Sequence, residues 1–131
     1  MTVNQQQLDA YVTDQRPMFE SLLGQMVEIP SISMDPSKSG DMLRMATMAT
    51  QVLKDAGAEA HIVETGGYPI ISGGWMTGAH HPTVTIYNHF DVQPAQEPEW
   101  KQDPFAFKNK DGIYHGRGAT DDKGPALSAL F

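Results

Sequence analysis

The chain has no cysteine and few basic residues. Because none of the 131 residues is cysteine, disulfide bonds and thiolate metal sites are excluded, and any metal ligands must be imidazole or carboxylate groups. Nine Lys and Arg against 16 Asp and Glu give a formal net charge of −7, so the average surface would repel an anionic partner. We therefore expect neither nucleic acid nor a membrane as a partner.

Long apolar runs and internal repeats are also missing. No apolar stretch approaches the length that spans a bilayer, and the first ten residues lack the cationic and apolar regions of a signal peptide. There is no low-complexity tract and no repeat at a solenoid period. These absences favour a soluble, cytoplasmic protein with one modest globular domain.

The first half of the chain predicts two helices followed by two strands. Apolar residues recur at helical spacing over residues 5–27, where Pro17 predicts either two short helices or one kinked helix. A second amphipathic stretch covers residues 40–56, and we expect its methionines to fill gaps in the core. Residues 58–64 and 68–75 have the composition of strands separated by a glycine turn.

The second half predicts shorter elements. Residues 82–87 are β-branched and favour a strand, residues 111–115 favour a short strand after a turn, and an apolar helix begins near Pro125. Helices interspersed with strands indicate an α/β domain with a mixed sheet. Because the last helix has no ending signal before Phe131, we expect residues 1–131 to be the N-terminal piece of a longer protein.

His89 and Asp91 follow the expected strand directly. In open α/β sheets ligands gather beyond the carboxyl ends of the strands, and the strand period of two lets both side chains point to the same side. His89 could then offer one ring nitrogen to a divalent ion while Asp91 accepts the proton of the other. The alternative is a buried, hydrogen-bonded histidine beside a capping aspartate, because a His-x-Asp tripeptide is a short motif.

An acidic pair, Asp121 and Asp122, lies in a turn braced by Gly116, Gly118 and Gly124. Adjacent carboxylates repel each other, so the pair favours a nearby cation or helix N-terminus. Either side chain could bind a metal, and a carboxylate can bridge two cations through its two oxygens. The alternative is helix capping with a solvated acid pair. A phosphate-binding loop is disfavoured, because the glycine spacing does not match one.

Three separate sequence blocks occur in an order that is typical of one enzyme family. They are residues 88–94 (Asn-His-Phe-Asp-Val-Gln-Pro), residues 100–105 with Trp and Asp-Pro-Phe, and residues 116–125, with the weaker block 29–33 before them. Through these blocks, residues 85–131 resemble the zinc-dependent exopeptidases, a family that includes carnosinases, cytosolic dipeptidases, aminoacylases, acetylornithine deacetylase and glutamate carboxypeptidases. The third block resembles the carnosinase-like dipeptidase branch more than the deacetylase branch.

The resemblance implies roles for individual residues. His89 matches a metal ligand, Asp121 matches the carboxylate that bridges two metals, and Asp91 matches the catalytic residue that orients the histidine. The peptide bond from Asp121 to Asp122 is expected to be cis. The resemblance implies two divalent ions, zinc first, although manganese or cobalt would suit nitrogen and oxygen ligands nearly as well.

The resemblance also implies a fold and an activity. The expected fold is the family's three-layer catalytic domain, here incomplete, with a mixed sheet between helices. The expected activity is hydrolysis of dipeptides or N-acyl amino-acid amides by a metal-activated water, with small peptides or N-acyl amino acids as substrates. The resemblance also implies a homodimer as one arrangement of the parent protein. The general-base glutamate, the remaining ligands and the lid domain would lie beyond Phe131, so we expect this chain alone to be inactive.

A non-catalytic binding or assembly module with the same fold is the alternative function. It is disfavoured because a module freed from catalysis has no need to keep His89, Asp91 and Asp121 together. Four further histidines match no ligand position: His61, His80, His81 and His115. For Trp100 and Phe105 we favour packing of the long loop over the sheet, with a substrate wall as the alternative.

Overall fold

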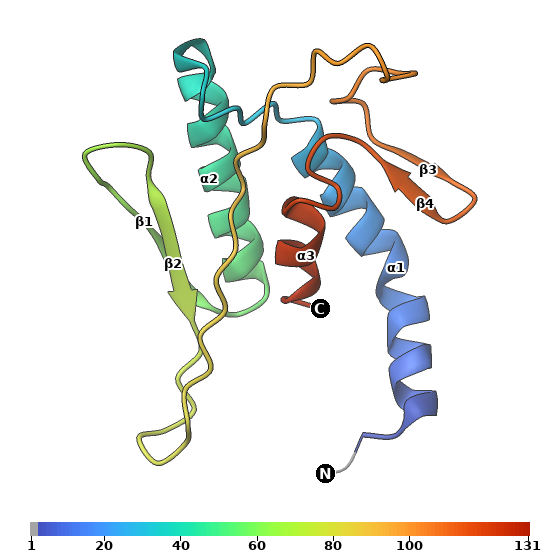
Figure 1. Cartoon of the computed structure of the whole chain (residues 1–131). Helices are drawn as coiled ribbons and strands as arrows, with labels where there is room; N and C mark the ends of the chain where they lie inside the picture. The colour runs from blue at the N-terminus through green and yellow to red at the C-terminus, as the bar shows by residue number, and fades with distance from the viewer. Residues whose placement is uncertain (1–2) are drawn as a thin grey trace.

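The computed structural model describes residues 3–131 (Figure 1). Its helices are α1 (Gln5–Val27), the 3-10 turn η1 (Pro36–Lys38), α2 (Ser39–Asp55) and α3 (Lys123–Ser128). Its strands are β1 (Glu59–Val63), β2 (Ile70–Gly74), β3 (Lys108–Lys110) and β4 (Ile113–His115). Over the described residues, no helix combines the length and the apolar character that crossing a membrane requires.

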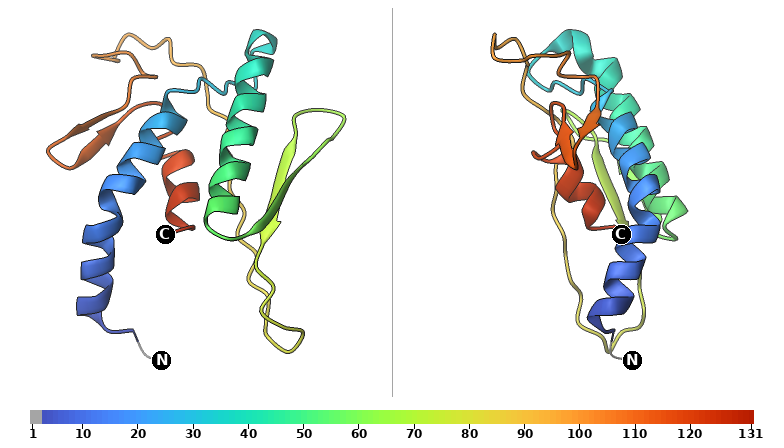
Figure 2. Two further views of the ribbon diagram at one scale, coloured as in Figure 1. Left: turned by 180° about the vertical axis from the view of Figure 1, so that it is seen from behind. Right: turned by 90° about the vertical axis from the view of Figure 1, so that its right-hand side faces the viewer.

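Helix α1 runs without interruption through Pro17, so this segment forms one helix and not two short helices. It begins with a capping box, in which the Asn4 side chain accepts from the Gln7 backbone at 2.9 Å and the Gln7 side chain accepts from the Asn4 backbone at 3.0 Å. The N-terminal half projects away from the other elements (Figures 1 and 2). Only the C-terminal half of α1 therefore contributes to the core.

The core forms where the C-terminal half of α1 meets α2 and α3. Its buried residues are Leu23, Met26, Val27, Ile29, Met45, Ala49, Val52 and Leu127. Met45 is 1% exposed and Met48 packs against the cluster, which confirms that methionines of the second helix fill the core. The packing of α3 against α1 brings the residues just before α3 close to the C-terminal end of α1.

The strands form two separate two-stranded antiparallel sheets within the described part of the chain. β1 and β2 pair from Glu59 opposite Gly74 to Val63 opposite Ile70, which confirms the two strands expected there. β3 and β4 form a hairpin, of which the sequence predicted only the second strand, β4. The α/β class is confirmed, while the sheet expected to join these strands is not formed among residues 3–131.

The strand expected at residues 82–87 is wrong. The segment lies in the long irregular path between β2 and β3 and pairs with no described strand (Figure 1). Val84, Ile86 and Tyr87 are 82%, 61% and 87% exposed. β-branched composition makes a segment suited to a sheet, but a strand exists only where a neighbour accepts its backbone hydrogen bonds.

Candidate metal centre

The segment that carries His89 and Asp91 is fixed by the loop between α1 and η1. The Ser31 hydroxyl donates to the Phe90 carbonyl at 2.6 Å, and the Val92 N–H donates to the Ser31 carbonyl at 2.9 Å. Ser31 is fully buried. The backbone on both sides of Asp91 is therefore held in place, although the segment belongs to no sheet.

The loop that carries Asp121 needs glycine to approach the same place. Gly116 and Gly118 have φ of +151° and +87°. A Cβ atom at Gly116 would lie 2.5 Å from the Val27 side chain, and one at Gly118 would lie 2.8 Å from the Val92 side chain. Only glycine allows this close contact, so Gly116 and Gly118 determine how closely the loop that carries the acidic pair approaches Val27 and Val92.

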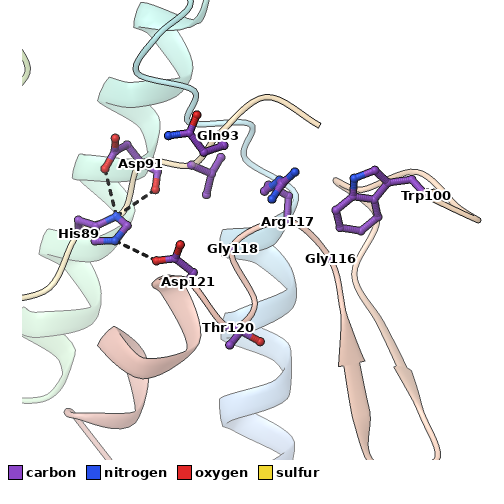
Figure 3. Close-up of a pocket in the computed structure, with 10 residues that line it drawn as sticks. His89, Asp91, Gln93, Trp100, Gly116, Arg117, Gly118, Thr120 and Asp121 are labelled. Atoms are coloured by element: carbon purple, nitrogen blue, oxygen red, sulfur yellow. Dashed lines mark hydrogen bonds and ion pairs between the residues drawn. The ribbon is translucent and has the colours of Figure 1, made fainter. Parts of the chain in front are cut away.

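The structure brings His89, Asp91 and Asp121 together (Figure 3). Nδ1 of His89 is 3.2 Å from both Oδ1 and the carbonyl oxygen of Asp91. Nε2 of the same ring is 3.1 Å from Oδ1 of Asp121, a residue 32 positions away in the sequence. The two ring nitrogens thus face two different carboxylates, and a cation bound at Nε2 would lie between the ring and Asp121.

The second aspartate of the pair has a different place. Asp122 Oδ2 accepts from the His89 backbone N–H at 3.2 Å, and the Asn88 amide nitrogen, in the orientation that satisfies its bonds, donates to the same oxygen at 3.2 Å. The peptide bond between Asp121 and Asp122 is cis, as expected. The two neighbouring carboxylates therefore diverge, one toward the imidazole and one toward the backbone that carries it.

Three carboxylates determine the protonation of His89. Partial burial by itself would lower the pKa of this imidazole, but the bond to the Asp91 backbone and the charges of Asp91, Asp121 and Asp122 outweigh burial and raise the pKa. The same negative potential favours a bound cation. A divalent ion needs the neutral imidazole, so ion and proton compete for Nε2.

The donor set fits a divalent ion. Zinc binds nitrogen and carboxylate oxygen at about 2.0–2.2 Å, and two such ligands at a tetrahedral angle are about 3.4 Å apart. Nε2 of His89 and Oδ1 of Asp121 are 3.1 Å apart, so one ion needs only a small adjustment between them. No group of three or more His, Asp or Glu side chains within residues 3–131 is arranged to hold a metal, so His89 and Asp121 by themselves would give an ion only two of its ligands.

A cavity of about 200 Å³ opens beside these groups (Figure 3). Besides His89, Asp91 and Asp121, its lining includes Gln93, Trp100 and Arg117. The Arg117 guanidinium stacks on the Trp100 ring at 5.2 Å and donates to Glu97 at 2.8 Å. Trp100 therefore lines the cavity as well as packing on the loop, and sequence reasoning did not assign this role to Gln93 or Arg117.

The remaining aromatic and histidine candidates lie elsewhere. Phe105 is not among the residues that line the cavity. The four further histidines, His61, His80, His81 and His115, are all exposed, and none joins His89 at this centre. The sequence signal that could have indicated Arg117 is its position between Gly116 and Gly118. In the structure, both glycines lie close to buried side chains.

Comparison with known proteins relates the chain to a family of peptidases. Residues 85–131 match the family described as peptidase family M20/M25/M40. The chain is 33% identical to the Cys-Gly metallodipeptidase dug1 of Schizosaccharomyces pombe, over 97% of this chain and 29% of that protein. It is also 33% identical to the Beta-Ala-His dipeptidase of Rattus norvegicus, over 94% of this chain and 28% of that protein.

Residues 85–131 belong to the M20 peptidase family. The fold of the chain agrees with this assignment, because the crystal structure of human carnosine dipeptidase 1 superposes with a TM-score of 0.86 at 32% identity. That match covers 92% of this chain and 28% of the human protein. The chain thus spans less than a third of the length of the relatives it matches.

Proposed function

We propose that residues 1–131 form the N-terminal part of the catalytic domain of a metal-dependent dipeptidase. His89 and Asp121 are the proposed metal ligands, and Asp91 is the residue that orients the His89 ring. The observation that carries the proposal is the placement of Nε2 of His89 3.1 Å from Asp121, with Asp91 at the opposite nitrogen. Relatives of similar sequence are named as dipeptidases and metallodipeptidases.

Two divalent ions suit the ligands, with zinc favoured and manganese or cobalt acceptable. His89 would bind one ion, and Asp121 would bridge both through its two oxygens. The Asp121 side chain is 84% exposed, so its second oxygen is accessible to a further ligand. When bound, such a pair supplies polarisation of an amide carbonyl and a nucleophilic water at neutral pH.

The other residues of this chain orient the ligands and the substrate. With an ion bound, Asp91 would accept the Nδ1 proton and so leave Nε2 as the binding nitrogen. Trp100 and Arg117 form a wall of the cavity next to the ligands, where a small peptide or N-acyl amino acid would lie. We further propose a cytoplasmic parent protein that is able to form a homodimer.

Metal titration tests the ligand assignment. We expect the 131-residue chain to bind Co²⁺ weakly, because it supplies a partial ligand set, and to hydrolyse no dipeptide. His89→Ala and Asp121→Ala should each remove this binding, measured by isothermal titration calorimetry after removal of metal with a chelator. His61→Ala is the matched control, because His61 is an exposed histidine of β1 that lies outside the centre.

Equal binding by the wild type, His89→Ala and Asp121→Ala would count against the ligand assignment. Loss of binding in all three variants, including His61→Ala, would also count against the assignment, because the loss would then not be specific to the proposed ligands. The non-catalytic module would gain support if a longer version of the chain that includes the rest of the family's catalytic domain bound dipeptides without cleaving them.

A further inference from the structure

One short loop contacts both segments that carry the proposed metal ligands. The segment Ile29–Ser33 follows α1 and is fixed to the His89 side by the two bonds of Ser31 to the backbone of Phe90 and Val92. It is fixed to the Asp121 side by Lys123, whose Nζ donates to the Ile29 carbonyl at 2.8 Å. The loop therefore has contacts through which it can set the distance between the two segments.

Within this loop, Ser33 contacts Asp91 directly. The Ser33 hydroxyl donates to Oδ2 of Asp91 at 2.6 Å, while Oδ1 of the same carboxylate faces Nδ1 of His89 at 3.2 Å. Both carboxylate oxygens are thereby engaged, one by each neighbour. A hydroxyl bond to an ionised carboxylate is among the stronger hydrogen bonds in proteins, and 2.6 Å is typical of it.

Ser33 is itself held from the opposite side. The Tyr68 hydroxyl, from the turn between β1 and β2, donates to the Ser33 carbonyl at 2.8 Å. Neither Ser33 nor Tyr68 lines the cavity. Any influence of these residues on a bound ion is therefore indirect, either through Asp91 and the His89 ring or through the loop backbone that Ser31 fixes to Phe90 and Val92.

Without the Ser33 bond, little would restrain the Asp91 carboxylate. The Asp91 side chain is 41% exposed, and among the described residues its other side-chain hydrogen-bond partner is the His89 ring that it is proposed to orient. A carboxylate free to rotate would hold that ring in several orientations. Partners one layer beyond a metal ligand typically change metal affinity by about 10- to 100-fold when they are removed.

We propose that Ser33 is a positioning residue that fixes the Asp91 carboxylate and, through it, directs Nε2 of His89 toward Asp121. This inference rests on the proposed metal centre and adds a third member, from a different part of the chain, to the pair formed by His89 and Asp91. The segment Ile29–Ser33 then serves as the common anchor of both ligand-bearing segments.

Co²⁺ titration of the metal-free 131-residue chain tests the inference. Ser33→Ala should raise the Kd for Co²⁺ by about tenfold, the lower end of the range for removed outer partners. Ser33→Thr keeps the hydroxyl and should restore the wild-type Kd. Ser21→Ala is the matched control, because Ser21 is an exposed serine of α1 whose hydroxyl accepts only a 3.4 Å bond from Gln25. It should bind as the wild type does.

Tyr68→Phe provides a second variant that leaves Ser33 in place. It removes the bond to the Ser33 carbonyl and should weaken Co²⁺ binding in the same direction, by a smaller factor than Ser33→Ala. The ¹⁵N shifts of the His89 ring provide a second measurement that needs no metal. At equal pH, the wild type and Ser33→Thr should show the same His89 ring shifts, while Ser33→Ala should show different ones, because the ring then faces an Asp91 carboxylate that is free to rotate.

The inference is overturned if Ser33→Ala binds Co²⁺ as tightly as the wild type and shows the same ¹⁵N shifts of the His89 ring. It is also overturned if Ser33→Thr is as weak as Ser33→Ala, because the hydroxyl would then have no role. If the wild type binds too weakly for a Kd, the comparison of ¹⁵N shifts decides alone. Failure of the proposed function is distinct from both results, because His89→Ala and Asp121→Ala would then leave Co²⁺ binding unchanged.

Discussion

Lys123 is fully buried without a carboxylate at ion-pair distance in the described part of the chain. Its Nζ donates to the carbonyl oxygens of Met26 and Ile29 at 2.8 Å each. Burial lowers the pKa of Lys123 from 10.5 to about 8, and the charges of Asp41 and Asp91 oppose that shift only in part. The stability of the chain should therefore depend on pH in a range where few other groups titrate.

The sign follows from the protons bound in each state. Below pH 8, Lys123 is charged both in the folded and in the unfolded chain, so the cost of burying the charge is fully present. Between about pH 8 and 10.5 the unfolded chain keeps a proton that the folded chain has lost, so the free energy of unfolding rises with pH. At about 1.4 kcal/mol per pKa unit, we expect a rise of about 2 kcal/mol from pH 7.5 to 9.5.

Lys123→Met removes this titration and keeps the volume of the side chain. The Met26 carbonyl still accepts from the Ile29 N–H at 3.2 Å and the Ile29 carbonyl from the Ser31 N–H at 2.8 Å, so the variant should fold. Urea unfolding followed by circular dichroism, with a chelator present, gives both free energies at pH 7.5 and 9.5. A wild-type minus variant difference that stays constant or falls with pH would refute the reasoning.

Two further predictions concern packing and a partly buried hydroxyl. Gly124→Ala should lower the free energy of unfolding by about 1–3 kcal/mol or more, because the added Cβ would overlap the Ala119 carbonyl oxygen. Gly40→Ala is the control, because its added Cβ meets nothing within 4 Å and should not destabilise the chain. Thermal unfolding of the two variants compares these effects. Burial and the bond to Glu20 raise the pKa of Tyr114. Tyr114→Phe should cost about 0.5–1.5 kcal/mol at pH 7, and the difference from the wild type should shrink as pH rises through that raised pKa; a difference that grows in alkaline solution would contradict this.

The candidate ligand residues could be named from the sequence because each motif is local, and the family resemblance assigned their roles. His89 and Asp91 are two positions apart, and the acidic pair lies among glycines whose freedom of backbone conformation the turn requires. Such motifs predict the residue types at a site without any knowledge of the path between them. Their roles as metal ligands stay predictions until a metal titration is done.

The helices were also predictable, whereas one strand was not. Amphipathic spacing indicated α1 and α2 within a few residues, since each helix forms its hydrogen bonds within its own segment. Residues 82–87 have the composition of a strand but no partner among residues 3–131. Pairing is a property of two segments, so composition alone could not decide it.

The sequence by itself determined which groups this chain can offer a cation, because the absence of cysteine leaves imidazole and carboxylate, and the motifs select among them. Only the tertiary structure decided that Ser33 holds Asp91, that Asp122 turns to the backbone of His89, and that Arg117 lies in the cavity wall. The bond of Ser33 to Asp91 joins residues 58 positions apart, and the bond of His89 to Asp122 joins residues 33 positions apart. The bond of Arg117 to Glu97 spans 20 positions. No local pattern encodes them, because they arise from how α1, α3 and the loops pack.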